Sequence, residues 1–513
     1  MKKRWKKILS LVCTIAFIVS TISVVNYYNN SSAQAAQKNS EEVKIKETTT
    51  KTGTKAPKYI FLFIGDGMSY PQIQATAYYL GAKASNGGVV SEPLSFMNFP
   101  IAGSAETYDS TSFAPDSAST ATSIATGYKT YSGTINMDTT YTKEYETISE
   151  KLKKQLGYKI GVISSVNLNH ATPAAFYAHQ ASRNNYYEIG LEMIESSFDY
   201  FAGGALISST GKNGDKEDLY KIAKDKGYKV VTKQNEAEKL SAKDGKAIVI
   251  AETLADSNSF SYAIDAKEKE WKLADYVEKG IEVLDNEKGF FMMVEGGKID
   301  WACHANDAGS TIHDTIALSK AVDEAIKFYN EHPEDTLILV TGDHETGGLA
   351  IGFAGTNYDT YLTNLANQKI SYAKFDADYV AKYKKNDTKF SDVLKDIDTN
   401  FGLVAEYNAK STTNPNLILT DYEYNRLYKA YKMTMDGYKQ LDEEQYVLYG
   451  SYEPLTVTIT HILNNKSGID FSSYAHTGLP VPVFALGNGA EVFAGYYNNT
   501  DIYSNMAALT SVK

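Results

Sequence analysis

The amino-acid sequence predicts an α/β fold: a three-layer α/β/α sandwich with a largely parallel central sheet and an inserted, mostly helical cap. Short apolar runs without polar alternation recur along the chain, which indicates strands buried on both faces. Segments with helical spacing separate these runs, as in βαβ units. A long charged segment interrupts the pattern before the last apolar run. With 513 residues, 43% of them hydrophobic, the chain can bury a large core.

The N-terminus is typical of an export signal. Five positive charges in M-K-K-R-W-K-K precede an apolar run from Ile8 to Val25, and Ala33-Gln34-Ala35 is a suitable cleavage site. We expect residues 1–35 to be a signal peptide and the protein to be secreted, either extracellular or in the cell envelope. Because the apolar run has 18 residues, an uncleaved signal anchor is the alternative. Cleavage would leave no stable membrane span.

Charge and cysteine content narrow the class of protein further. Cleavage after Ala35 removes five cations and changes the formal charge from -11 to -16, which argues against general nucleic-acid binding. It also removes Cys13, so that Cys303 is the only thiol and no internal disulfide can form. Residues 36–56 are mostly Lys, Glu and Thr, and they are expected to form a disordered linker.

The apolar runs place the strands of a catalytic α/β domain over 57–355 and 470–513. A helix is expected after Ser310, where apolar residues recur at helical spacing. In such folds, ligands bind at the carboxyl ends of the strands. The predicted strands are 59–64, 160–163, 247–251, 290–294, 337–340 and 481–486.

Residues 356–469 differ in character and predict an insertion. They are charged and Asn-rich, and they hold 14 of the 39 tyrosines. Amphipathic stretches such as Y-N-R-L-Y-K-A-Y-K-M predict helices. Because an apolar strand run follows this segment, it is an insertion packed over the catalytic domain, as a cap or an interface, rather than a trailing domain.

Carboxylates follow three of the predicted strands. Asp66, Glu295 and Asp343 each lie beside glycine at a strand end. A single acid in this position is commonly a helix cap or turn former. Three of them at strand ends that meet at one edge of a sheet predict a site.

Histidines add metal-binding character to these strand ends. Asp300 and His304 are one helical turn apart, His344 follows Asp343, and His476 precedes the last strand. Three Asp and three His suit two zinc-like ions. Glu295, Asp66 and the Thr172 hydroxyl would form a third, oxygen-rich site that favours magnesium. The remaining histidines are interpreted as surface or core residues: His179, His313, His332 and His461.

Ser117 is a candidate nucleophile in A-P-D-S-A-S-T-A-T. Small, helix-compatible residues follow it, so Ser117 should lie at a helix N-terminus, where backbone N–H groups favour an anion. A nearby metal could lower the pKa of its hydroxyl. The alternative is that Asp116 or Ser117 is only an N-cap.

Arg183 is a candidate phosphate ligand, because a guanidinium can bind two phosphate oxygens. Pro173 is expected as a first helical residue, with Thr172 near the cap and Arg183 about three turns later. The alternative is an exposed arginine at a helix end.

Six motifs together resemble the alkaline phosphatase family. They are D-S-A-S-T-A-T, G-D-G-M, H-A-T-P-A-A-x-x-A-H-x-x-S-R, V-E-G-G-x-I-D-x-x-x-H, T-G-D-H and H-T-G-x-P-V-P-V-F-A, in the family's order from Tyr59 to about Thr500 outside the insertion. The resemblance implies hydrolysis of small-molecule phosphate monoesters through a phosphoserine on Ser117, with Arg183 on the phosphate. It implies one zinc on Asp300, His304 and His476, a second on Asp66, Asp343 and His344, and a third metal, magnesium, on Asp66, Glu295 and Thr172.

Two positions depart from the best-known bacterial pattern. His170 stands where that pattern has Asp, and Trp301 where it has Lys. Both are expected beside the metal ligands or the phosphate, and the histidine would allow the third site to hold zinc or cobalt instead of magnesium. A homodimer is expected, since inserts in related enzymes shape a dimer or cap the site. The alternatives are a phosphodiesterase or phosphonate hydrolase of the same superfamily, and an inactive surface protein. The absence of C-x-P-S-R and S-x-P-S-R motifs argues against a sulfatase.

Overall fold

The computed structural model describes residues 44–45, 56–437 and 442–513. The predicted signal peptide and most of the predicted linker lie outside these residues. Of the linker, Ile45 packs against the hydrophobic core and the Lys44 carbonyl accepts a hydrogen bond from Asn330. No helix in the described ranges is both long and apolar enough to cross a membrane.

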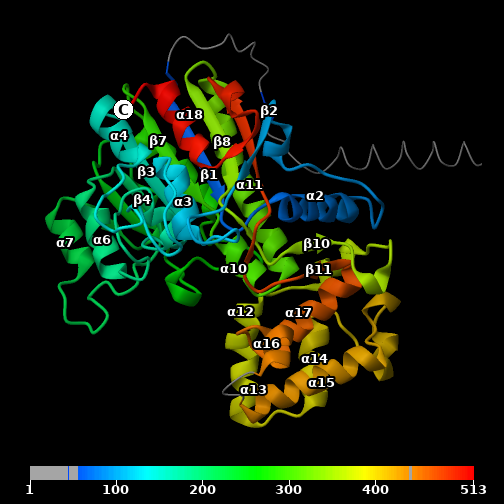
Figure 1. Cartoon of the computed structure of the whole chain (residues 1–513). Coiled ribbons are helices and arrows are strands. Elements are labelled where there is room, and N and C mark those ends of the chain that lie inside the picture. The colour runs from blue at the N-terminus through cyan, green and yellow to red at the C-terminus, as the bar shows by residue number, and fades with distance from the viewer. Residues whose placement is uncertain (1–43, 46–55, 438–441) are drawn as a thin grey trace, which may run out of the picture.

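A ten-stranded sheet forms the centre of the described structure, in the order β14-β2-β13-β8-β1-β7-β3-β4-β6-β5 (Figure 1). All neighbouring strands are parallel except β13, which is antiparallel to β2 and to β8. The strands are β1 Tyr59–Gly65, β2 Ile101–Glu106, β3 Lys159–Asn167, β4 Tyr200–Gly204, β5 Lys229–Val231, β6 Ala247–Ile250, β7 Phe290–Glu295, β8 Thr336–Gly342, β13 Val481–Gly487 and β14 Gly495–Asn498.

All six predicted strands are present, as β1, β3, β6, β7, β8 and β13. Four further strands, β2, β4, β5 and β14, were not predicted from the sequence. Their segments are short or half-exposed, as in I-A-G-S-A-E and K-V-V, and so have no continuous apolar run. These segments are strands because they pair with neighbouring strands, and an apolar sequence pattern does not indicate such pairing.

The sheet has a hydrophobic core on each face, because successive side chains of a strand point to opposite sides. Ile60, Leu62 and Ile64 of β1 face one core, while Phe61 and Phe63 face the other. Each of these side chains is fully buried, which contributes about 2 kcal/mol relative to exposure. The predicted three-layer α/β/α arrangement is therefore confirmed.

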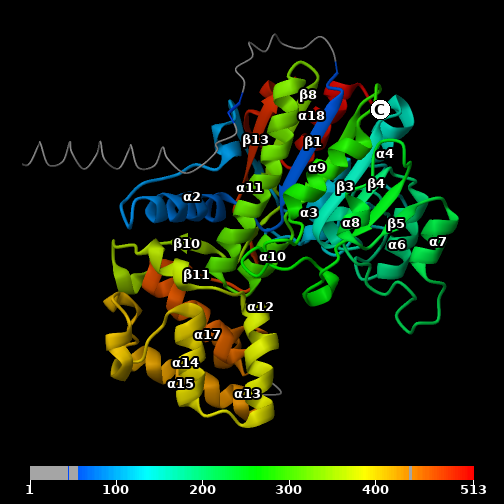
Figure 2. The same ribbon diagram turned by 180° about the vertical axis from the view of Figure 1, so that it is seen from behind.

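Helices α3 and α18 pack on the first core, and α9 and α11 pack on the second (Figure 2). The helix predicted after Ser310 is α11; its N-cap Asp307 accepts a hydrogen bond from the Ser310 amide, 2.9 Å away. The helices outside the insertion are α2 Tyr70–Ala84, α3 Ser117–Thr126, α4 Ile148–Lys151, α5 Ala171–Ala174, α6 Tyr186–Glu195, α7 Leu219–Asp225, α8 Gln234–Ala237, α9 Leu273–Leu284, α10 Lys298–His304, α11 Ala308–Glu331 and α18 Thr500–Thr510.

The segment predicted as an insertion forms a helical lobe below the sheet, yellow to orange in Figure 1. It leaves the α/β body at β10 (Leu349–Ile351) and returns at β11 (Ile469–Phe471), and these two strands pair antiparallel. Its apolar residues share one core with residues of α2 and α11, so the lobe packs against the body. Its main helices are α12 Tyr372–Phe375, α13 Ala381–Asn386, α14 Phe390–Phe401, α15 Asp421–Asp436, α16 Glu443–Tyr449 and α17 Pro454–Ser467.

Candidate active site

Four neighbouring strands deliver acidic and histidine side chains to one edge of the sheet. Asp66 directly follows β1, Glu295 ends β7, Asp343 directly follows β8, and His170 lies just beyond β3. In the sheet order β8-β1-β7-β3, these four ends are side by side. The Gly67 amide donates to Asp343 Oδ1 over 3.2 Å, which ties two of the ends together. Parallel pairing thus gathers residues that are far apart in the sequence.

The acids and histidines form three groups whose potential ligand atoms lie within 4.8 Å of one another. No fourth such group occurs in the ranges the structure describes. Carboxylates that are buried without cations carry a large desolvation cost, so the donor sets fit cations. The groups are Asp300, His304 and His476; Asp66, Asp343 and His344; and Asp66, His170 and Glu295.

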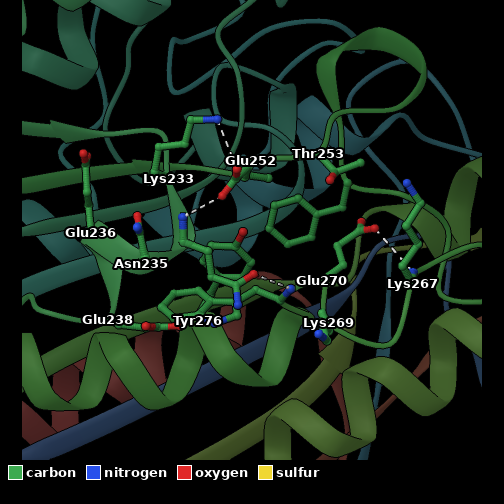
Figure 3. A pocket seen from close by; sticks show the side chains of 14 residues that line it. Lys233, Asn235, Glu236, Glu238, Glu252, Thr253, Lys267, Lys269, Glu270 and Tyr276 are labelled. Carbon is green, nitrogen blue, oxygen red and sulfur yellow. Dashed lines mark hydrogen bonds and ion pairs between the residues drawn. The ribbon is translucent and has the colours of Figure 1, made fainter.

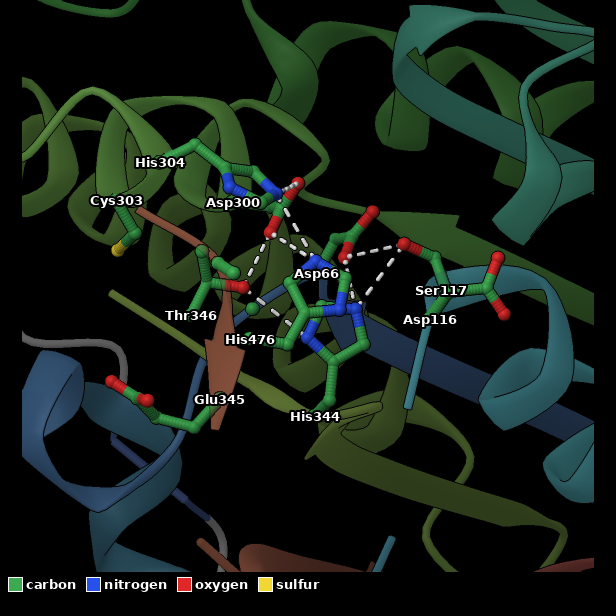
Figure 4. A network of polar contacts seen from close by, with 12 residues as sticks. Asp66, Asp116, Ser117, Asp300, Cys303, His304, His344, Glu345, Thr346 and His476 are labelled. Carbon is green, nitrogen blue, oxygen red and sulfur yellow. Dashed lines mark hydrogen bonds and ion pairs between the residues drawn. The ribbon is translucent and has the colours of Figure 1, made fainter. Parts of the chain in front are cut away.

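The first group joins helix α10 to the short strand β12 (His476–Thr477). Helical spacing places Asp300 and His304 on one face, with His304 Nε2 3.4 Å from Asp300 Oδ2. His476 Nε2 lies 3.1 Å from His304 Nε2 and 3.5 Å from Asp300 Oδ1 (Figure 4). Both Nδ1 atoms face backbone carbonyls, those of Tyr474 and Pro115, so the Nε2 atoms are the ones that point at a cation.

The second group lies at the ends of β1 and β8. His344 Nε2 is 3.2 Å from Asp66 Oδ1 and 3.5 Å from Asp343 Oδ2. Burial opposes charge on His344, but Asp343 and Asp66 outweigh it and raise its pKa to about 10. Burial and the charge of Asp66 raise the pKa of Asp343. The two acids therefore favour a positive charge at this point of the site.

The third group contains two buried atoms without a hydrogen-bond partner in the described structure, Glu295 Oε1 and His170 Nδ1. Burial and the charge of Asp66 raise the pKa of Glu295, while burial and Arg183 lower that of His170 to about 4. The Thr172 hydroxyl donates to Asp66 Oδ2 over 3.4 Å, so it also reaches this group. A neutral imidazole and an unpaired carboxylate oxygen are both suitable metal ligands.

Ser117 is the first residue of helix α3, and Asp116 is its N-cap, accepting from the Ser119 amide at 3.1 Å. The residue is 1% exposed. Its Oγ lies 3.2 Å from His344 Nε2 and 3.4 Å from Asp66 Oδ1, so the hydroxyl faces the second group (Figure 4). The N-cap considered as the alternative is Asp116, and Ser117 lies at the helix N-terminus beside the acids, as predicted.

Arg183 reaches the site by a different route from the one predicted. Helix α5 begins at Ala171, has Pro173 in its first turn and ends at Ala174, and Arg183 follows in a turn. The predicted three-turn helix is therefore wrong. Asn136 Nδ2 binds the carbonyls of Ala175 and Ala178, at 2.7 and 2.8 Å, and so satisfies groups that another helical turn would have used.

The Arg183 guanidinium contacts Asp116, the residue before Ser117, and His170. Nη1 donates to Asp116 Oδ2 over 2.9 Å, and Nη2 is 3.1 Å from His170 Nε2. Burial opposes ionisation of Asp116, but Arg183 lowers its pKa, so the pair is ionic. A guanidinium has five N–H donors, and those not used here can bind an anion.

Several residues around the site were not predicted from the sequence. The Thr346 hydroxyl donates to Asp300 Oδ1 and contacts His344 Nδ1, and Ser164 donates to Glu295. Thr346 lies two residues after His344, and side chains two residues apart in a strand point to the same side. This spacing is the feature of the sequence that could have indicated Thr346. Trp301 packs edge-on against His170, with ring centroids 5.9 Å apart.

A separate cleft of about 720 Å³ lies beyond the ends of β5 and β6 (Figure 3). Its aromatic residues pack on one another: the Phe260 and Tyr276 rings stack at 4.8 Å, and Trp271 meets Tyr276 at 5.1 Å. Lys233 at its rim pairs with Glu252. None of the acids and histidines of the three groups lines it, so its lining does not supply the chemistry described above.

The charge on His344 predicts that the affinity of the second group for a metal ion rises with pH. A metal ion must displace the His344 proton, so its apparent Kd should fall by about tenfold per pH unit per proton released, up to pH 10. The raised pKa of His344 stabilises the metal-free fold fully below its unfolded value near 6.5, and this stabilisation is lost as pH approaches 10. The Tm difference between metal-loaded and metal-free protein should therefore widen from pH 7 to pH 9, as calorimetry can measure. A metal affinity independent of pH would show that His344 is not a metal ligand.

The fold and the buried serine among carboxylates indicate an α/β enzyme of the hydrolase class. The family model described as alkaline phosphatase matches residues 57–202 and 196–512. The chain belongs to the alkaline phosphatase family.

Individual relatives agree with this family. Alkaline phosphatase 4 of Bacillus subtilis (strain 168) is 31% identical over 452 residues, which cover 86% of each chain. Alkaline phosphatase 3 of the same organism is 29% identical over 519 residues, covering 99% of this chain and 97% of the relative. The crystal structure of a cold-active alkaline phosphatase from a psychrophilic Shewanella species is 28% identical. It superposes with a TM-score of 0.72 over 88% of this chain and 99% of that one.

Proposed function

We propose that this protein hydrolyses phosphate monoesters through a phosphoserine formed on Ser117. The observation that carries the proposal is the place of this hydroxyl: it starts helix α3, faces His344 and Asp66, and directly follows Asp116, which binds Arg183. A phosphoryl group there would meet a helix N-terminus and a guanidinium. The family membership supports the same reaction.

The three acid–histidine groups would hold the cofactors: zinc in the first and second, and magnesium, zinc or cobalt in the third, with Thr172. The donor chemistry fits, because the first two groups combine imidazole and carboxylate ligands. When bound, such ions lower the pKa of a nucleophile and neutralise charge on phosphoryl oxygens.

The chain's own residues would then carry the reaction in two steps. Ser117 Oγ attacks phosphorus, its bond to phosphorus forms, and the bond to the ester oxygen breaks, so that the alcohol leaves with a proton. Water next attacks phosphorus, the serine–phosphorus bond breaks, Ser117 regains its proton, and inorganic phosphate leaves. Asp116 holds Arg183 in place for both steps through the 2.9 Å ion pair.

Arg183 favours a monoester over a diester, because its donors would bind the terminal oxygen that a diester has esterified. The purified, metal-loaded protein should release phosphate from phenyl phosphate and cleave the diester diphenyl phosphate far more slowly. Arg183→Ala should lower kcat/KM for the monoester by about tenfold or more and leave the diester rate nearly unchanged. Lys154→Ala, on an exposed ion pair with Glu146, is the control variant. Faster diester cleavage by the wild type would favour a phosphodiesterase.

We also propose that the protein acts outside the cytoplasm, as a homodimer. The N-terminal cations and apolar run support export. N-terminal sequencing of the exported protein would show cleavage near Ala35, and analytical ultracentrifugation would give the oligomeric state. Retention in the cytoplasm would contradict the proposed export, and a monomer in solution would contradict the proposed homodimer.

A further inference from the structure

Three tyrosines form a continuous aromatic surface beside the first acid–histidine group, here called the tyrosine wall: Tyr372, Tyr452 and Tyr474. Tyr372 and Tyr452 come from the helical insertion, and Tyr474 lies two residues before His476. The Tyr372 and Tyr452 rings meet edge-on at 5.7 Å, and the Tyr452 and Tyr474 rings are 6.1 Å apart and nearly parallel. All three residues are half-buried.

The tyrosine wall is connected directly to the candidate active site. The Tyr474 carbonyl lies 2.6 Å from His304 Nδ1. Helix α17 of the insertion approaches the same place: His461 Nε2 lies 2.9 Å from Oδ1 of Asn306, two residues after His304, and the His461 ring is 6.0 Å from the Tyr474 ring. The insertion therefore supplies side chains to the edge of the site.

The surroundings hold the wall in a defined shape. The Tyr474 hydroxyl donates to the Leu448 carbonyl over 2.6 Å, and Tyr262 donates to the Tyr372 hydroxyl over 3.0 Å. Gly450 lies against the Tyr474 ring, where an added Cβ would come within 2.7 Å. Rings that are ordered before a ligand binds lose less entropy on binding.

The wall lies on the side of the site that is remote from the nucleophile. His344 is 3.2 Å from Ser117 Oγ, its ring stacks on His476 at 3.7 Å, and His476 Nε2 is 3.1 Å from His304 Nε2. This series of contacts runs from Ser117 to the first group, and Tyr474 lies beyond it. In an in-line displacement, the leaving oxygen is opposite the attacking oxygen. The alcohol of a bound ester would therefore point toward the wall.

We infer that the tyrosine wall binds the leaving group and selects phosphate monoesters of flat, aromatic alcohols over those of small polar alcohols. The inference rests on the proposed function, which it makes more specific. Aromatic rings attract one another in stacked and edge-on arrangements, and three rings at different angles offer both. A small polar alcohol such as glycerol has no ring to pack on these tyrosines. Its hydroxyl groups would lose hydrogen bonds to water at the wall and gain none in return.

The test compares phenyl phosphate with glycerol 2-phosphate in metal-loaded enzyme. Tyr452→Leu should lower the kcat/KM ratio of the two esters, phenyl over glycerol, by about fivefold, which corresponds to about 1 kcal/mol. The change should appear mainly in KM for phenyl phosphate. Tyr452→Phe keeps the ring and should keep the ratio. Tyr446→Leu, an exposed tyrosine of the same lobe, is the matched control and should keep it too.

Calorimetry separates this inference from the proposed function. Phenylphosphonate should bind more tightly than methylphosphonate to the wild type, and Tyr452→Leu should reduce that difference. A wild type that hydrolyses neither ester would refute the proposed function, while the two phosphonates still test the wall. An unchanged ester ratio and an unchanged phosphonate difference in Tyr452→Leu, with Tm and metal content preserved, would overturn the inference. If Tyr452→Leu unfolds, a lowered ratio in Tyr372→Leu supports the wall and an unchanged one overturns it.

Discussion

Replacing Ser117 by alanine is expected to lower kcat/KM for phenyl phosphate by about 10³-fold or more, because the reaction would lose its covalent step. The side chain is 1% exposed and the change removes a single atom, so the fold should persist. Steady-state kinetics give the rate. Acid quenching during turnover, followed by mass spectrometry, should find phosphate on the peptide that contains Ser117 in the wild type and none in the variant.

Ser123→Ala is the matched control, since Ser123 is a buried serine of the same helix whose Oγ donates to the Ser119 carbonyl, at 3.0 Å. It should keep wild-type kinetics and the phosphopeptide. Full activity in Ser117→Ala would remove the nucleophile assignment.

Removing bound metal is expected to abolish activity and to lower Tm by about 10 °C or more. A ligand present at 1,000 times its Kd stabilises the fold by about 4 kcal/mol, and the site offers three donor groups. Without cations, Asp66, Glu295, Asp300 and Asp343 would remain buried with only histidine protons and Arg183 to offset them. Chelation, metal analysis and calorimetry measure both effects, and added zinc and magnesium should restore them.

The choice of histidine gives a matched control for the metal sites. His304→Gln should remove about one zinc per chain, whereas His313→Gln should remove none, because His313 lies on α11 with its Nδ1 facing the Gly309 carbonyl. Equal metal content and Tm with and without chelator would contradict the three-site interpretation.

The strands that carry the site could be predicted because they are buried on both faces. Such strands read as continuous apolar runs, and the acids that end them stand out against that background. Helical spacing alone placed Asp300 and His304 together, and α10 has that geometry. The small residues after Asp116 likewise indicated the start of α3.

The path of the chain to Arg183 and the place of His170 in the third group could not be predicted from local sequence patterns. The helix at Pro173 was predicted to be too long. Helix propensity carries no information on the distant Asn136, whose side-chain amide donates hydrogen bonds to the carbonyls that follow this helix. His170 was expected only beside the metal sites, but the end of β3 brings it to within 4.8 Å of Asp66 and Glu295. Both outcomes depend on contacts between segments that are distant in the sequence.

The sequence by itself determined which residues could do chemistry and which runs could be strands, because composition and spacing are local properties. It also marked residues 356–469 as different from the rest. Only the tertiary structure decided which acid pairs with which histidine, that Arg183 reaches Asp116 from a turn, and that Tyr452 of the insertion packs on Tyr474. These outcomes follow from strand order and from the packing of the lobe on the body, which no local pattern specifies.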